Sequence, residues 1–434
     1  MDLPTMVRVR QRLYDRVLLD LDSVVIRDVE RRLAGRVTAG QQIAIATGSR
    51  GVANVARIVR GVAEAVRRVG GEPFVVPAMG SHGGATAEGQ VEILASLGVT
   101  EAFVRCPIRS SMDVVQIGTT DDGLPVFLDK YAASADGIIV VNRIKKHTDF
   151  HGEVESGVLK MICIGLGKQA QADLVHSYGA WGLKHYVPRV ARVTLAKAPI
   201  LLGVATLENG YDETCEIATF DASELEAGEK RLLRKHRRTY PSLPVDAIDL
   251  LIVDWLGKNI SGTGMDTNVI GRIRIYGVPE PKRPRIQTIV ALGLTEESHG
   301  NGVGVGLADL ISRRLRDQID EATMAVNVIT SGFLDRGRIP ITLSSDQLAI
   351  ETALSRLPLA TRSRARVVRI QNTLHLGELE VSESLLDEVL QNPNVSVVGD
   401  PHPLEFDGNG TIKPFVPEHR GEAEAVTNGR LVGI

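Results

Sequence analysis

The sequence predicts an α/β protein built from largely parallel sheets whose faces are covered by helices. Short runs rich in isoleucine, valine and leucine recur without polar alternation, as expected for strands buried on both faces. Segments with apolar residues at helical spacing follow the first two of these runs. The turns between strand and helix are rich in glycine, which accounts for 43 of the 434 residues.

The first elements follow one another as strand, turn and helix. The first strand, Gln42-Ile-Ala-Ile-Ala46, stops at Thr47-Gly48-Ser49-Arg50, and apolar residues at helical spacing then extend over 52–69. A second strand at 73–77 and a helix at 86–97 complete a βαβα unit. Further strands are expected at 137–142, 200–207 and 250–255. Ligands bind beyond the carboxyl ends of such strands, so chemistry is expected in the turns at 47–50, 80–84 and 142–151.

Chain length and one charged segment predict two domains. Single hydrophobic cores rarely grow beyond about 250 to 300 residues, and this chain has 434. Residues 221–244 are highly charged and end in Tyr240-Pro-Ser-Leu-Pro244, after which an apolar strand begins. We therefore expect an N-terminal α/β domain over residues 1–244 and a C-terminal α/β domain over 245–434.

Composition and charge favour a cytoplasmic protein without a nucleic acid or membrane partner. The formal net charge is −3, and the basic run Arg231–Arg238 is typical of the solvated face of a helix. The three cysteines are widely spaced, which argues against a disulfide framework. No stretch approaches 18 apolar residues, and the N-terminus lacks the apolar segment of a signal peptide.

Chemically active side chains are densest just after the strand expected at 137–142. His147 and His151 are four residues apart, but a lone pair of this kind is more typical of a solvated turn than of a metal site. Lys160 lies in an apolar run, where lysine is unusual unless it is paired or covalently used.

Two glycines follow the lysine at short spacing. Gly165 and Gly167 could bring backbone N–H groups close to a phosphate. The same Gly-x-Gly pattern is also common in turns that bind nothing, so the pattern alone leaves both interpretations open.

Together these residues resemble the lactate-racemase family, and the resemblance extends over nearly the whole chain. Members of that family carry a nickel-pincer nucleotide, a pyridinium nucleotide whose thio groups hold nickel and which is joined to a lysine. Lys160 follows Ser156-Gly157 as the tethering lysine does, and His176 comes sixteen residues later, where the family has its nickel-binding histidine. The resemblance implies that Lys160 carries the cofactor, that His176 binds nickel, and that Gly165 and Gly167 contact the cofactor.

The resemblance also implies an acid/base pair and a substrate clamp in the N-terminal domain. The family's arginine after the first strand falls on Arg50, which would hold the substrate carboxylate as a bidentate fork. Its first acid/base histidine falls on His82. Its second is expected about ten residues before the lysine, at Phe150, so either His147 or His151 must serve. We favour His147, because it follows the strand end most directly.

The C-terminal domain departs from the family. There the family has an Asp-x-Asn segment followed by a glutamine and a lysine that touch substrate, whereas here Asp266-Thr-Asn268 is followed by Gly271 and Arg274. We expect Arg274 to bind substrate, the domain to close the substrate cleft, and the substrate to be a 2-hydroxy acid other than lactate.

The reaction implied is racemisation or epimerisation at C2, by abstraction of hydride to the cofactor and its return. The two enantiomers each need a base, and His82 and His147 fit that pair. The implied partners are a small-molecule 2-hydroxy acid and the enzymes that make the cofactor.

Other function classes compete with this interpretation. A nicotinamide-dependent dehydrogenase would share the hydride chemistry, but no Gly-x-Gly-x-x-Gly follows the first strand. A non-catalytic nucleotide- or metal-binding protein would be expected to have lost the active positions, and Arg50, His82, Lys160 and His176 are all present. A metal-dependent hydrolase or lyase that uses His147 and His151 is a further alternative.

Overall fold

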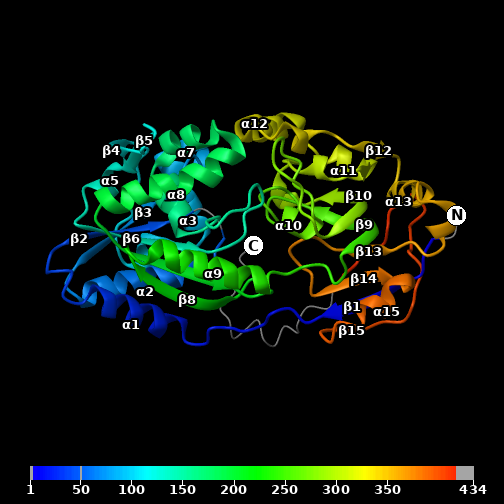
Figure 1. The fold of residues 1–434 in the computed structure, drawn as a ribbon, viewed down its shortest axis with the longest axis horizontal. Helices are drawn as coiled ribbons and strands as arrows, with labels where there is room; N and C mark the ends of the chain where they lie inside the picture. The colour runs from blue at the N-terminus through cyan, green and yellow to red at the C-terminus, as the bar shows by residue number, and fades with distance from the viewer. Residues whose placement is uncertain (1–2, 49–50, 417–434) are drawn as a thin grey trace. The chain divides into compact units, whose positions relative to one another are not determined.

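The computed structural model describes residues 3–48 and 51–416, which form two compact units. One unit spans Tyr14–Tyr240, and the other joins the residues up to Leu13 to the chain from Pro241 onward. Helices and sheets alternate in both (Figure 1), which confirms the α/β class.

In the described part of the unit Tyr14–Tyr240, five strands form a sheet in the order β3-β2-β6-β7-β8. These strands are β2 (Gln42–Thr47), β3 (Glu72–Pro77), β6 (Gly137–Arg143), β7 (Ile200–Glu208) and β8 (Thr214–Asp221). All neighbours are parallel except β7 and β8, which are antiparallel. A separate antiparallel pair joins β4 (Val114–Thr119) to β5 (Pro125–Asp129).

Helices cover both faces of this sheet. The helices of the unit are α1 (Leu21–Leu33), α2 (Val55–Arg68), α3 (Ala87–Ser96), α4 (Glu101–Val104), α5 (Lys130–Ala133), α6 (Val158–Lys160), α7 (Lys168–His176), α8 (Gly179–Lys197) and α9 (Leu225–Thr239). The apolar faces of α1 and α2 pack on one face of the sheet in a single core, and the two helices run together in Figure 1. On the other face, Gly203 of β7 lies under Val158 of α6 and Leu225 of α9, so both helices pack on β7.

Within residues 3–13 and 241–416, eight strands form a sheet in the order β12-β11-β10-β9-β13-β14-β1-β15. They are β1 (Met6–Gln11), β9 (Ala247–Leu256), β10 (Arg285–Leu294), β11 (Leu310–Ser312), β12 (Ile341–Leu343), β13 (Val367–Ile370), β14 (Glu378–Ser382) and β15 (Val395–Val397). The helices here are α10 (Thr267–Ile270), α11 (Arg313–Asp317), α12 (Glu321–Ser331), α13 (Asp346–Ser355), α14 (Leu359–Arg362) and α15 (Leu386–Val389). The strands from β12 to β13 are parallel, and the rest are antiparallel.

The strands and helices expected from the sequence are confirmed, with ends that differ by up to three residues. One difference concerns the N-terminal strand, which the sequence places in the domain expected over residues 1–244. Strand β1 instead pairs with β14 and β15, and Met6 is buried in the core of the other unit. The partners of β1 lie more than 300 residues away in the sequence, and no local pattern reveals them. The apolar face of β1 would fit either sheet equally well. No described helix is long and apolar enough to cross a membrane.

Candidate active site

His147 lies in a loop that begins where β6 ends. An isolated β-bridge between Lys145 and Ser156 closes this loop, so its tip is held at the carboxyl edge of the parallel sheet. The side chain of His147 is only 10% exposed and packs against the ring of Phe150, with ring centroids 4.6 Å apart. The imidazole is thus fixed by packing before any ligand binds.

A buried carboxylate holds this loop together. The side chain of Glu155 is fully buried and accepts the backbone N–H groups of His147 at 2.7 Å and Gly152 at 3.1 Å. Arg237 of α9 donates to it, and His151 Nδ1 lies 3.4 Å away. Burial alone would raise the pKa of Glu155, but the donors from His151, His147 and Arg237 outweigh it and lower the pKa to about 2.

Lys160 and His147 are in direct contact. Lys160 Nζ lies 2.6 Å from His147 Nε2, and Nδ1 of the same ring accepts the N–H of Asp149 at 3.1 Å. The direction of the hydrogen bond between Lys160 and His147 depends on which ring nitrogen carries the proton, and the contact places the Lys160 amine directly against the imidazole.

His176 is the last residue of α7, exposed to solvent at the end of the helix. Desolvation by nearby protein atoms lowers its pKa, and the positive charge of Lys160 lowers it further, against the opposite effect of Asp149 and Asp173. These effects indicate that Lys160 and Asp149 lie close enough to His176 to interact with it electrostatically. A lowered pKa keeps the imidazole neutral, the form that binds metal. No cluster of three or more histidine, cysteine, aspartate or glutamate side chains within residues 3–48 and 51–416 could hold a metal ion.

His82 lies at the carboxyl end of β3 in an exposed turn. Gln90 Nε2 donates to the carbonyl oxygens of Gly80 at 2.9 Å and His82 at 3.3 Å. The Gln90 amide oxygen in turn accepts from Lys168 Nζ at 2.9 Å. Lys168 is fully buried, donates to the carbonyl of Pro77 and pairs with buried Asp129 at 3.2 Å.

This network connects the His82 turn to the segment that follows Lys160. A π-helical segment, Met161–Gly165, continues the chain after α6, and the N–H of Gly80 donates to Gly165 at 3.4 Å. A Cβ on Gly165 would lie 2.6 Å from the carbonyl oxygen of Ala78, and one on Gly167 would lie 2.5 Å from that of Cys163. Close backbone packing is therefore sufficient to explain both glycines, and their contact with a cofactor stays a prediction.

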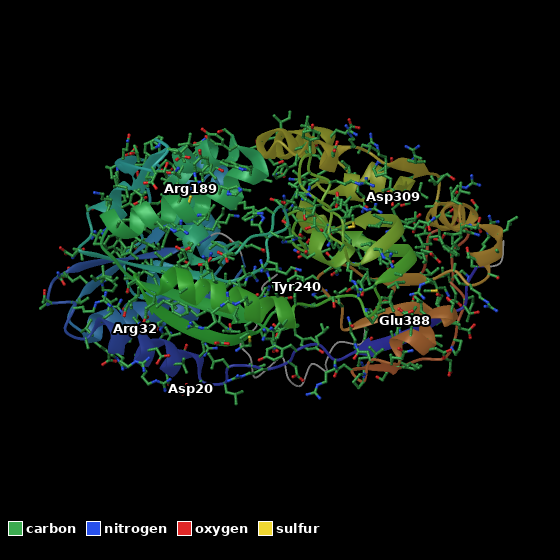
Figure 2. All side chains as sticks on the ribbon, in the orientation of Figure 1. Asp20, Arg32, Arg189, Tyr240, Asp309 and Glu388 are labelled. Carbon is green, nitrogen blue, oxygen red and sulfur yellow. The ribbon has the colours of Figure 1, made fainter. Side chains whose placement is uncertain are left out.

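The two arginines expected to bind substrate differ in what the structure shows. Arg50 lies outside the described residues. The guanidinium of Arg274 donates to the carbonyl oxygens of Gly306 and, at 3.2 Å, Ala308, and it pairs with Asp309 at 2.8 Å (Asp309 is labelled in Figure 2). Arg274 borders a cavity of about 530 Å³ that Arg338 and Arg356 also line. Its contacts brace the 306–309 loop, and its binding of substrate stays a prediction.

Residues 28–181 match the family model described as the lactate racemase N-terminal domain. This part of the chain therefore resembles the lactate racemase N-terminal domain. The lactate racemase apoprotein from Thermoanaerobacterium thermosaccharolyticum is 12% identical and matches with a TM-score of 0.51 over 84% of this chain and 94% of that chain. A protein from Thermotoga maritima, known from a crystal structure, is 11% identical, with a TM-score of 0.47 over 65% of this chain and 72% of that one. No curated protein matches the sequence.

The residues that match the lactate racemase pattern come together in part. His147, Lys160 and His176, all within the matched range, share one neighbourhood, whereas the contact shown for His82 is the hydrogen bond from Gln90 to its backbone carbonyl. The second-domain position Arg274 lies in the other unit.

Sequence reasoning missed the residues that support this lactate racemase-like site. Arg237 lies in the basic run that the sequence assigns to a solvated face, although it pairs with the fully buried acid Glu155. Lys168 is a fully buried cation that no pattern in the sequence singled out. The available signal was weak, because a charged residue next to a glycine-rich turn is usually exposed.

Proposed function

We propose that this chain is a racemase or epimerase that inverts C2 of a 2-hydroxy acid with the help of a nickel-pincer nucleotide. The observation that carries the proposal is the 2.6 Å contact between Lys160 Nζ and His147 Nε2, with His176 within electrostatic reach. A lysine amine, a candidate base and an imidazole with a lowered pKa then stand at one edge of a domain that resembles the lactate racemase N-terminal domain. We also propose that the N-terminal domain carries this chemistry and that the protein works in the cytoplasm, where the cofactor-making enzymes would supply the nucleotide.

The side chains present fit such a cofactor. Lys160 would be the group joined to it, and His176 would be the protein ligand of nickel, a metal that imidazole nitrogen binds readily. When bound, the nucleotide supplies an electrophilic ring that accepts hydride and returns it. The exposed position of His176 at the end of α7 leaves its ring accessible to a bound metal.

Two bases serve the two enantiomers in this proposal. His147 accepts the hydroxyl proton of one enantiomer, and its ring is held in place because Glu155 anchors its backbone. His82 serves the other enantiomer from the turn after β3. Arg50 would grip the reacting carboxylate, and Arg274 would contact the rest of the substrate.

The experiment compares protein produced with and without the cofactor-making enzymes. Peptide mass spectrometry should find an adduct on Lys160 only when those enzymes are present, and chiral chromatography should then detect inversion of 2-hydroxy acids. Lys160→Ala should abolish both, whereas Lys197→Ala, at the exposed end of α8, should abolish neither. Fully active, nickel-loaded protein with unmodified Lys160 would refute the proposal.

A further inference from the structure

A buried acid lies directly beneath the helical turn that carries Lys160. Glu229 of α9 is only 1% exposed, and its Oε2 accepts the N–H of Leu159 at 2.9 Å. The N–H of Val158 donates to the same carboxyl. The acid is seventy residues away in sequence from the residue that it binds.

This contact supplies the hydrogen-bond acceptor that the start of α6 lacks. The helix is a single turn, Val158–Lys160, and the residue before it, Gly157, has no side chain that could cap it. The first N–H groups of any helix have no partner within the helix, so a turn this short depends on acceptors from elsewhere. Glu229 provides that acceptor.

The turn is held from the other side as well. Asn142, near the end of β6, donates from Nδ2 to the carbonyl of Gly157 at 2.8 Å. The strand end and α9 therefore grip consecutive peptide groups just before Lys160. The Lys160 backbone is fixed between them, and its amine reaches His147.

Gly157 leaves the space that the Glu229 carboxylate occupies. Its backbone is extended, with φ at −171°, so no left-handed conformation requires glycine here. Space does, because a Cβ at this position would lie 2.2 Å from Glu229 Oε1. Any other residue would push the carboxylate away from the turn.

We propose that Glu229 is a positioning residue that holds the Lys160 amine against His147, and that Gly157 is glycine to admit it. The inference rests on the proposed function only in naming the cofactor as the group to which Lys160 is joined. The position of the amine is a property of the protein without cofactor and is tested as such.

Because Glu229 titrates, its positioning role should make the position of Lys160 depend on pH. A role in packing alone would not produce such a dependence. Burial is the largest cause and raises the pKa of Glu229 to about 7, against the two backbone N–H groups, which lower it. The charged neighbour that acts on it is Glu226 on the same helix, while the facing residues of 157–159 are uncharged. Above this pKa the carboxylate accepts strongly, and below it the charge-assisted hydrogen bonds weaken.

The experiment measures how fast trinitrobenzenesulfonate modifies Lys160 in cofactor-free protein, relative to exposed Lys197 in the same molecule. Peptide mass spectrometry quantifies both, and hydrogen exchange follows the amides of residues 158 and 159. Glu229→Gln and Gly157→Ala should each shift the Lys160 labelling rate toward that of exposed Lys197, because the amine would no longer be held against His147. Both should speed exchange of the two amides.

The matched control is Glu226→Gln, one turn earlier on α9, which should leave both measurements at wild-type values. In wild type the ratio of Lys160 labelling to Lys197 labelling should change in a step near pH 7, where Glu229 titrates, and Glu229→Gln should lack this step. Gly157→Ala keeps the acid, so it tests the hold even if a Glu229 variant does not fold. Wild-type labelling and exchange in both variants would overturn the inference. If instead labelling changes as expected while no cofactor ever attaches, the proposed function fails and the positioning role stands.

Discussion

Replacing Glu155 by glutamine should loosen the loop that holds His147 by about 3 kcal/mol at neutral pH. The magnitude follows from the pKa of Glu155, which falls from the ordinary 4.5 to about 2 in the folded protein, at about 1.4 kcal/mol for each unit. The side chain is fully buried, so screening by solvent does not reduce this figure. Glutamine keeps one acceptor oxygen but loses the charge that Arg237 and the two backbone N–H groups stabilise.

The effect should depend on pH with a defined sign. Because the folded pKa is depressed, the ionised carboxylate contributes its full stability above the unfolded value near 4.5 and loses it as the pH falls toward 2. The difference between wild type and Glu155→Gln should therefore be about constant from pH 7 to 5 and shrink below that.

Native-state hydrogen exchange of the His147 and Gly152 amides is the suitable assay, because a chain with two units need not unfold in one step. Glu153→Gln is the matched control: it lies in the same loop and removes the same charge, but its side chain is 80% exposed. That variant should change the local free energy by less than about 0.5 kcal/mol. Equal effects of the two variants, or a Glu155→Gln effect unchanged between pH 7 and 3, would refute this reasoning.

Three further predictions concern other parts of the chain. Lys168→Met should lower the free energy of unfolding by about 3 to 5 kcal/mol, because it leaves Asp129 buried without its cation; a thermal melt within a degree of wild type would contradict this. His176→Ala should lose nickel, measured by elemental analysis, while circular dichroism stays unchanged, and nickel at wild-type stoichiometry would place the ligand elsewhere. Arg50→Lys should reduce turnover of the preferred 2-hydroxy acid more than Arg274→Lys, because misplacing the reacting carboxylate lowers rate as well as affinity. Lactate should be a poor substrate; if Arg274→Ala leaves substrate preference unchanged, Arg274 only braces the 306–309 loop.

The sequence by itself determined the features that depend on neighbours along the chain. Apolar runs without alternation predicted β2, β3, β6, β7 and β9, because a strand covered on both faces must be apolar at every position. The spacing of Lys160 after Ser156-Gly157 and before His176 was equally local, and it was sufficient to indicate a lactate racemase-like chain.

Only the tertiary structure decided which distant residues support the site. Glu229, Arg237 and Lys168 are charged residues beside or within amphipathic segments, and in sequence they are indistinguishable from residues of a solvated face. Whether such a side chain ends in water or beneath the turn that carries Lys160 depends on how the helices pack on the sheet, over separations of about 70 to 90 residues. The cost of burying a charge is then offset by backbone N–H groups and carbonyls that come into reach only in the folded chain. For the same reason β1 joined the unit that begins at Pro241, since strand pairing satisfies backbone groups without regard to distance along the sequence.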